Sequence, residues 1–314
     1  MEQVDASIAR YLRALDRADR EEGDVAEAKS VRLKEKIAGL RRQMQSLKEM
    51  AQQVQAAPDQ QVSLTDPDAR SMATSGRGTG IVGYNVQIAV ETEHHLIVAH
   101  EVINQGFDRH QLAPMALKAQ QATGCAQVTA LADRGYFYGD QVLACEGTGV
   151  APIVPKTLTS SGAKLGFFTR QDFIYDTEHD HYTCPAGAKL TKAKRRADHT
   201  EDLDFYRHLS ACFTCPLKSR CTPTKLRRIK RWVNEDVLDR MQDRLDRMPE
   251  AMGVRRQTVE HPFGTLKAWM GATHFLTRTL DKVRAEMSLH ILAYNLKRMI
   301  TIFGVGPLME AIRT

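Results

Sequence analysis

The chain has 314 residues, which is long enough to bury the core of one large domain or of two smaller ones. Its 42% hydrophobic and 26% charged residues are typical of a globular protein, and no run approaches the ~18 consecutive apolar residues of a transmembrane helix. The net charge of +6 permits an acidic partner without requiring one.

The amino-terminal sequence has no basic leader followed by an apolar run, so we expect a cytoplasmic, nucleoid-associated protein without membrane contact. In that reducing compartment, six cysteines are poor candidates for structural disulfides. Clustered cysteines therefore indicate a metal site.

Residues 1–57 are predicted to be helical, with almost no helix-breaking residue. Apolar side chains recur at spacings of three and four residues, at Val4, Ile8, Tyr11, Leu15, Leu33, Ile37, Leu40, Met44 and Leu47. This pattern favours a helical hairpin or a coiled coil, and it equally fits a seam that packs on the domain behind it. Neither alternative gives the segment a catalytic role.

Loop residues dominate the stretch that follows Pro58. Asp66 and Asp68 flank a proline there, and a glycine-rich segment follows at 76–80. No Gly-Lys-Ser/Thr comes after those glycines, so they do not predict a phosphate cradle. The two aspartates are typical of turns, although either could supply a metal-binding carboxylate.

Alternating strands and helices then predict an α/β core with a mixed sheet. Residues 82–90 and 96–102 read as the strands of a hairpin. A helix from near Pro114 to Gly124 follows, and the apolar run 128–132 predicts a buried strand that ends at Asp133.

Regular patterning stops between Phe167 and Trp232, where four of the six cysteines fall within 38 residues. These are Cys184, Cys212, Cys215 and Cys221. Four thiolates can complete a tetrahedral Zn²⁺ site. The alternatives are unpaired thiols, or replacement of one cysteine by His179, His181 or His208. The remaining cysteines, Cys125 and Cys145, lie on apolar faces and are expected to be buried.

The same region is basic, with 13 Lys/Arg against 4 Asp/Glu from Lys189 to Arg231. Such a patch can hold DNA through its phosphates, largely independently of sequence. The cations that we expect to contribute are Arg195, Arg196, Arg227, Arg228, Lys230 and Arg231.

From Asn234 the chain is predicted to be helical to near its end. Arg256, Glu260 and Lys267 stand at i, i+4 and i+11, so one helix face carries a carboxylate between two cations. Pro262 cannot donate a backbone hydrogen bond, so we expect a kink beside Glu260. The last helix is expected from about Leu280 to Phe303.

These motifs resemble those of the DDE transposases of bacterial insertion sequences. That family marks its last carboxylate with Tyr-x2-Arg-x3-Glu-x6-Lys, which Arg256, Glu260 and Lys267 match while Gly253 replaces the tyrosine. Its second carboxylate stands in Ala-Asp-(Arg/Lys)-Gly-Tyr, matched by residues 132–136. The resemblance extends from about residue 60 to residue 303.

The resemblance implies an RNase-H-like core in which Asp133 and Glu260 hold Mg²⁺ or Mn²⁺ for cleavage and transfer of DNA strands. Arg256 and Lys267 would bind phosphate. Double-stranded DNA, at transposon ends and target, would be the substrate. The protein would act as a homo-oligomer or paired with a full-length transposase.

The first aspartate of the family stands on a strand before Gly-Ser or Gly-Thr, and no such segment occurs here. We therefore expect an N-terminally truncated, incomplete copy with little activity alone. In the family that strand lies between the strands matching 81–90 and 127–133. We expect these two to be separated, bridged by a substitute or completed by another molecule.

The sequence thus predicts four parts. They are a helical segment at 1–57, the first part of the core at 58–160, a basic Cys-rich insertion at 161–232 and C-terminal helices at 233–314. Two other functions stay open, namely a non-catalytic DNA-binding regulator that pairs with an intact transposase, and a metal-dependent nuclease.

Overall fold

The computed structural model describes residues 1–20, 24–72, 80–157, 165–193 and 202–313. Its contacts divide the chain into two compact units. The first comprises Met1–Asn85, Val102–Gly106 and Leu276–Ala285, and the second comprises the remaining residues. None of the helices in the described ranges combines the length and the apolar run needed to cross a bilayer.

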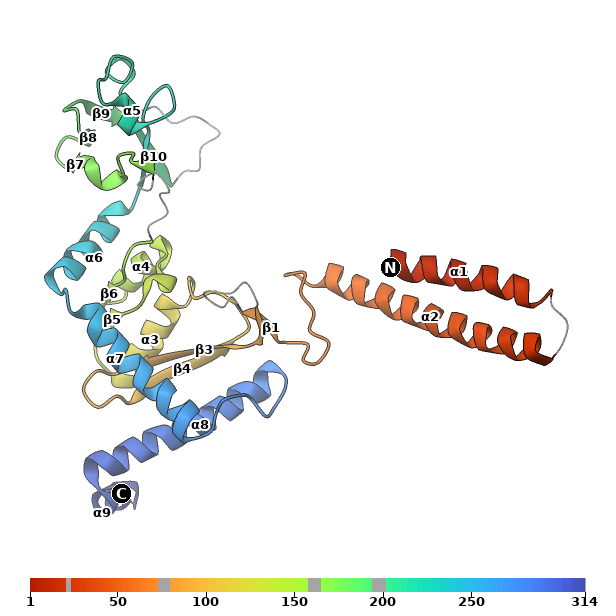
Figure 1. Cartoon of the computed structure of the whole chain (residues 1–314). Helices are drawn as coiled ribbons and strands as arrows, with labels where there is room; N and C mark the ends of the chain where they lie inside the picture. The colour runs from red at the N-terminus through yellow and green to blue at the C-terminus, as the bar shows by residue number, and fades with distance from the viewer. Residues whose placement is uncertain (21–23, 73–79, 158–164, 194–201, 314) are drawn as a thin grey trace. The chain divides into compact units, whose positions relative to one another are not determined.

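The first unit begins with two helices that lie side by side (Figure 1). These are α1 (Glu2–Ala18) and α2 (Asp24–Ala56). The predicted seam faces inward, since Ile37 is 5% and Met44 7% exposed, and Ala18 is buried where the helices are joined. Ser30 donates a hydrogen bond of 2.8 Å to Asp19 across that junction.

The rest of the first unit is built around a short antiparallel pair, β1 (Arg70–Met72) and β2 (Ile81–Gly83). Asp66 and Asp68 precede β1, and their carboxylates accept hydrogen bonds from the backbone N–H groups of Thr279 and Leu280. These N–H groups lie at the start of a long helix, α8 (Leu280–Phe303), whose first turn has no internal acceptor for them. Both aspartates therefore cap a helix.

Two separate two-stranded sheets follow along the chain. The hairpin β3 (Asn85–Val90) and β4 (Ile97–Ile103) forms one, and the parallel pair β5 (Val128–Leu131) and β6 (Val150–Ile153) forms the other. In the described part of the chain, β3 does not pair with β5. This arrangement agrees with the expected separation of these strands.

Helices α3 (Leu112–Thr123) and α4 (Gly139–Glu146) pack with β5 and β6 into the main apolar core. Its fully buried members include Val142, Cys145 and Met241. Gly124 ends α3 in the left-handed conformation that glycine adopts without strain, with φ 66°.

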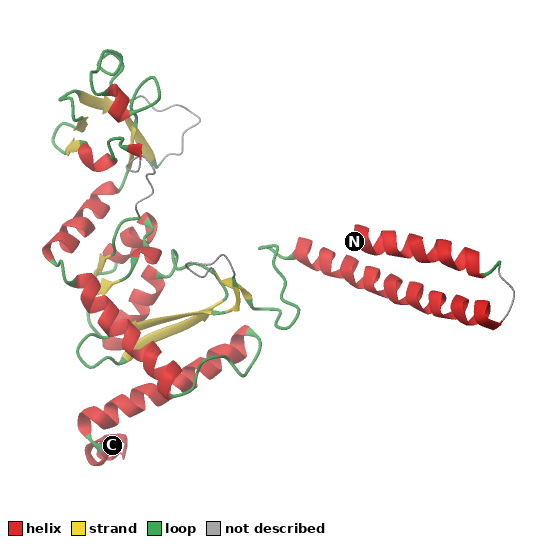
Figure 2. Cartoon of the chain, in the orientation of Figure 1, coloured by secondary structure: helices red, strands yellow, loops and turns green. Residues whose placement is uncertain are grey.

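The Cys-rich insertion is a regular five-stranded antiparallel sheet in the order β11-β10-β9-β8-β7 (Figure 2). Its strands are β7 (Ile174–Asp176), β8 (His181–Thr183), β9 (Lys189–Lys192), β10 (Leu203–Arg207) and β11 (Ile229–Trp232). The expectation that regularity stops here was wrong. Strands of three to five residues are too short to show an alternating pattern, and the burial of Tyr182, Leu190 and Tyr206 becomes evident only when they meet.

The remaining helices are α5 (Lys218–Cys221), α6 (Glu235–Arg247), α7 (Ala251–Gly264) and α9 (Val305–Arg313). Ion pairs join the sheet of the insertion to α6, with Arg170–Glu235 at 2.9 Å and Arg231–Asp239 at 3.0 Å. In α8, the predicted inward residues are buried, namely Val283, Met287, Ile291 and Tyr294.

Candidate active site

Asp133 stands immediately after β5 and caps a 3-10 turn, Arg134–Tyr136. One carboxylate oxygen accepts the Gly135 N–H at 2.8 Å, and the other is paired with the Arg255 guanidinium at 2.7 Å. Arg255 lies on α7, so this ion pair brings the strand end and the predicted catalytic helix together.

A second carboxylate lies beside Asp133. A Cβ atom added to Gly135 would meet Asp133 Oδ1 at 3.0 Å and Asp108 Oδ2 at 3.5 Å, so the glycine sits between the two carboxylates. Asp108 Oδ1 accepts the Gln87 amide at 2.7 Å, and Gln87 accepts the Tyr136 hydroxyl. Burial, together with the charges of Asp108 and Asp133, raises the pKa of Tyr136, so its phenol stays a donor.

Glu260 lies on α7 but away from this ion pair. It is exposed, and the structure gives it no ion pair with any described residue, Arg256 included. Five residues separate Arg255 and Glu260, which turns them about 140° apart around a helix. Arg256 and Lys267 are exposed as well, with the Lys267 ammonium 5.8 Å from the centre of the Phe263 ring.

The helix continues through Pro262, which is buried, and then changes to a π-helical turn at Thr265–Trp269. The Met270 N–H reaches back five residues to the Thr265 carbonyl, at 3.1 Å. His261 contacts the Tyr294 hydroxyl through Nδ1 at 3.2 Å, which fits a packing role better than a catalytic one.

A cavity of about 340 Å³ separates β3 from β5. Val86, Ile88 and Val90 line it from β3, Val128 and Leu131 from β5, and further apolar side chains come from α3 and α7. Tyr136 and Arg255 also line it, so the cavity reaches the region of Asp133. The cavity is partly open to solvent, and most of the side chains that line it are apolar.

The four clustered cysteines line a second cavity, of about 220 Å³, together with His208 and Arg227. Burial and the neighbouring thiols of Cys212, Cys184 and Cys215 raise the pKa of Cys221, while Arg227 opposes the shift. Cys145 is buried as expected, and burial raises its pKa to about 12. Cys125 is exposed, contrary to expectation, because it follows the Gly124 turn and leaves the helix face.

The cations predicted to bind phosphate in the Cys-rich insertion divide into four groups. Arg228 and Lys230 are exposed and available. Arg231 is 8% exposed, is paired with Asp239 and lies 3.8 Å from the Tyr175 ring centre, so its guanidinium already has partners within the chain. Arg227 turns into the cysteine cavity. Arg195 and Arg196 lie outside the described residues.

Carboxylates such as Asp133 and Glu260 occur in many kinds of enzyme, and comparison with known protein families identifies which kind this chain belongs to. The family described as "Transposase DDE domain" matches residues 52–296. The chain belongs to this family of DDE transposases. No curated protein and no solved structure gave a significant match.

Membership of the DDE transposases implies DNA as the partner and divalent metal as the cofactor of the family. Two residues of this transposase that lie beside Asp133 could not be identified as site residues from the sequence. Asp108 lies in the loop after β4 and belongs to no recognisable sequence motif. Its position next to Gly135 is evident only from the folded structure. Arg255 precedes Arg256, and the sequence does not show which of the two faces β5.

Proposed function

We propose that this chain is the strand-cleavage and strand-transfer core of an insertion-sequence transposase, with Asp133 and Glu260 as two of its metal-binding carboxylates. The observation that carries the proposal is the ion pair between Asp133 at the end of β5 and Arg255 on α7. It holds the helix of Glu260 against the strand of Asp133, as a site built from both would require.

The donor chemistry fits Mg²⁺ or Mn²⁺, because carboxylate oxygens are the ligands that these hard ions prefer. When bound, two such ions activate the attacking oxygen and neutralise charge on the phosphate and the leaving group. Arg255 balances the charge of Asp133 in their absence. Arg256 on α7 and Lys267 on the π-helical turn that follows it are both exposed, which suits them to bind the DNA backbone.

We place the third carboxylate on an extended segment that occupies the cavity between β3 and β5. The cavity is lined by both β3 and β5, and the two strands do not pair with each other among the described residues, so the cavity is the position that an added strand would take. Asp66 and Asp68 are poorer candidates, because their oxygens already accept hydrogen bonds at the start of α8. An aspartate on the inserted strand, near Tyr136 and Arg255, would adjoin Asp133.

The test is DNA nicking by the purified chain in Mg²⁺ or Mn²⁺, alone and with an added amino-terminal segment encoded in frame upstream. The chain alone is expected to bind DNA without cleaving it, which is also the behaviour of a regulator. The extended chain is expected to cleave, and Asp133→Asn or Glu260→Gln should abolish cleavage. Asp140→Asn, an exposed carboxylate on α4, serves as the control.

Cleavage by the unextended chain that depends on Asp133 and Glu260 would remove the need for an inserted strand. Cleavage that survives both substitutions would instead refute the assignment of the site. Binding without cleavage in every form would leave the regulator as the better description.

We also propose that Cys184, Cys212, Cys215 and Cys221 hold a structural Zn²⁺. Besides the shared cavity, the support is the Arg227 Nε, a buried donor that lacks a hydrogen-bond partner in the described part of the chain. Arg227 lines the same cavity as the four cysteines. If these cysteines bind a metal ion as thiolates, they become stronger hydrogen-bond acceptors for the Arg227 N–H than neutral thiols are.

Metal analysis checks this proposal. One zinc ion per chain should be lost with Cys212→Ser and retained with Cys125→Ser, because Cys125 is exposed and lies outside the cavity. An unchanged zinc content in Cys212→Ser would exclude the site.

A further inference from the structure

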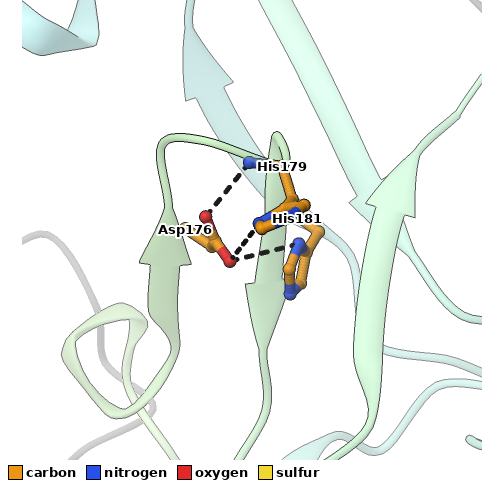
Figure 3. A group of neighbouring side chains, drawn as sticks. All are labelled: Asp176, His179 and His181. Carbon is orange, nitrogen blue, oxygen red and sulfur yellow. Dashed lines mark hydrogen bonds and ion pairs between the residues drawn. The ribbon is translucent and has the colours of Figure 1, made fainter.

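The turn between β7 and β8 brings together three side chains that the proposed function does not use. Asp176 ends β7 and His181 begins β8, directly opposite in the antiparallel register, while His179 lies in the turn between them. Figure 3 shows the three side chains directed toward one another. Among the described residues, this is the group whose histidine and carboxylate ligand atoms all lie within 4.8 Å of one another.

The carboxylate of Asp176 is oriented by its own turn. Its Oδ1 accepts the backbone N–H groups of Glu178 at 3.0 Å and His179 at 3.1 Å. Its Oδ2 faces the two imidazoles, 3.0 Å from His179 Nδ1 and 3.8 Å from His181 Nδ1. The backbone and side-chain hydrogen bonds of His179 lower the pKa of Asp176, so the carboxylate is charged at neutral pH.

His181 is the unusual member, because it is only 5% exposed. Within the ranges that the structure describes, its ring makes no hydrogen bond, and its Nδ1 lies 3.8 Å from Asp176 Oδ2. Burying a polar ring nitrogen without a partner is unfavourable. Protonating both histidines would not remove the problem, because one carboxylate cannot balance two imidazolium ions. A cation shared by all three groups would satisfy every ligand atom.

We propose that Asp176, His179 and His181 bind a divalent ion of the Zn²⁺ class, at a site separate from the cysteine cavity. Two imidazole nitrogens and one carboxylate oxygen are a ligand set that zinc, cobalt and nickel accept. None of the three residues lines the cysteine cavity. The side chain of His179 is 69% exposed, which leaves the ion open to water and to an entry path.

The site would pin the hairpin at the edge of the five-stranded sheet, since β7 is the outermost strand. An edge strand pairs with a neighbour on one side only, so a metal ion bound to both strands of the hairpin would add a further link between β7 and β8. This inference is independent of DNA cleavage, and it holds whether or not the chain is an active transposase.

The experiment is isothermal titration of the full chain, freed of metal, with Zn²⁺ and with Co²⁺. We expect His179→Gln to reduce the number of bound ions by one, or to weaken one binding event at least tenfold, relative to the unsubstituted chain. The bound Co²⁺ that is lost should show no sulfur-to-metal charge-transfer band, which distinguishes it from an ion on the cysteines.

His94→Gln is the matched control. His94 stands three residues after Glu91, with Nδ1 3.9 Å from its carboxylate, and so repeats the Asp176–His179 spacing without a second imidazole in a cluster. His179 is preferred over buried His181 for substitution, because an exposed residue can be changed without unfolding the sheet. Zn²⁺ binding that is equal in His179→Gln and the unsubstituted chain would overturn the proposal, as would an equal loss in His94→Gln.

Discussion

At the scale of single residues, the end of β5 is a connected set of polar side chains. The Tyr136 hydroxyl donates to Gln87, Gln87 donates to Asp108, and Asp133 is paired with Arg255. Gln87 is 2% exposed, so these bonds fix a buried side chain of β3 to Asp108 and Tyr136, in addition to the pairing of β3 with β4. These side-chain hydrogen bonds therefore connect β3 to the turn that follows β5.

Removal of one donor tests this role. Tyr136→Phe should lower the free energy of unfolding by about 1 kcal/mol, because buried Gln87 loses a hydrogen-bond partner. Tyr138→Phe, at a tyrosine that is 39% exposed, should change it by less than about 0.5 kcal/mol. Urea denaturation measures both, and equal effects would show that the Tyr136 hydroxyl is not a structural donor.

Asp66 predicts a pH dependence of stability. Burial opposes ionisation, but hydrogen bonds from Tyr84 and the backbone of Asp68 and Thr279 hold the pKa of Asp66 below its ordinary value. A lowered folded-state pKa stabilises the protein above the unfolded pKa of about 3.9, and this stability is lost as the pH falls through the folded value.

Asp66→Asn should therefore cost about 1–2 kcal/mol at pH 7 and progressively less below about pH 4. Asp16→Asn, at an exposed position on α1, should show no such convergence with the unsubstituted chain. Thermal unfolding between pH 3 and pH 7 provides the measurement. A difference that grows toward acid would contradict the capping role.

The sequence could predict the residue types of the site but not their partners. The Ala-Asp-Arg-Gly-Tyr motif follows an apolar run and contains a glycine, a combination that is typical of a buried strand ending at a turn. The structure has β5 and a 3-10 turn at these positions. The sequence could not show that Arg255 pairs with Asp133, since neighbouring positions on a helix differ by about 100° in direction. Nor could it show that Arg231, on strand β11, is buried and paired with Asp239.

At the scale of elements, long helices were predictable and short strands were not. Helices α1, α2 and α8 repeat apolar residues over several turns, so their inward faces follow from the sequence. Strands β7 to β11 are too short for their period to be recognised. Their core of tyrosines, with the Tyr182 and Tyr206 rings packed edge to face and their centres 5.1 Å apart, arises from tertiary contacts.

Two glycines should respond oppositely to alanine. Gly39 lies within α2 and has no atom within 4 Å of an added Cβ, so Gly39→Ala should stabilise the helix by about 0.5–1 kcal/mol. Gly149 has φ 83°, and its Cβ would lie 2.7 Å from the Ala126 carbonyl oxygen.

Gly149→Ala should therefore destabilise the start of β6 by more than about 1 kcal/mol, because both the backbone conformation and the contact are unfavourable. Urea unfolding of the two variants checks the signs. A stabilised Gly149→Ala would mean that the turn before β6 differs from the one described.

At the scale of the whole molecule, DNA binding is expected to depend on the summed positive charge of the chain more than on any single contact. The family implies DNA, and the exposed cations of the insertion offer a surface for phosphates. Lys230 on β11 is exposed whereas its neighbours Ile229 and Arg231 are buried, as the alternation of a strand requires. Arg228, directly before β11, is exposed as well.

DNA binding should depend steeply on salt, and each cation that contacts a phosphate contributes to the slope. Arg228→Gln and Lys230→Gln should each reduce the slope of log K against log salt by about 0.9, with little change in sequence preference. Lys34→Gln, an exposed cation on α2, should leave the slope unchanged if the insertion is the DNA surface. Fluorescence anisotropy over a salt series makes the comparison. A slope that responds to Lys34 but not to Lys230 would place the DNA contact on the pair of helices α1 and α2 and not on the insertion.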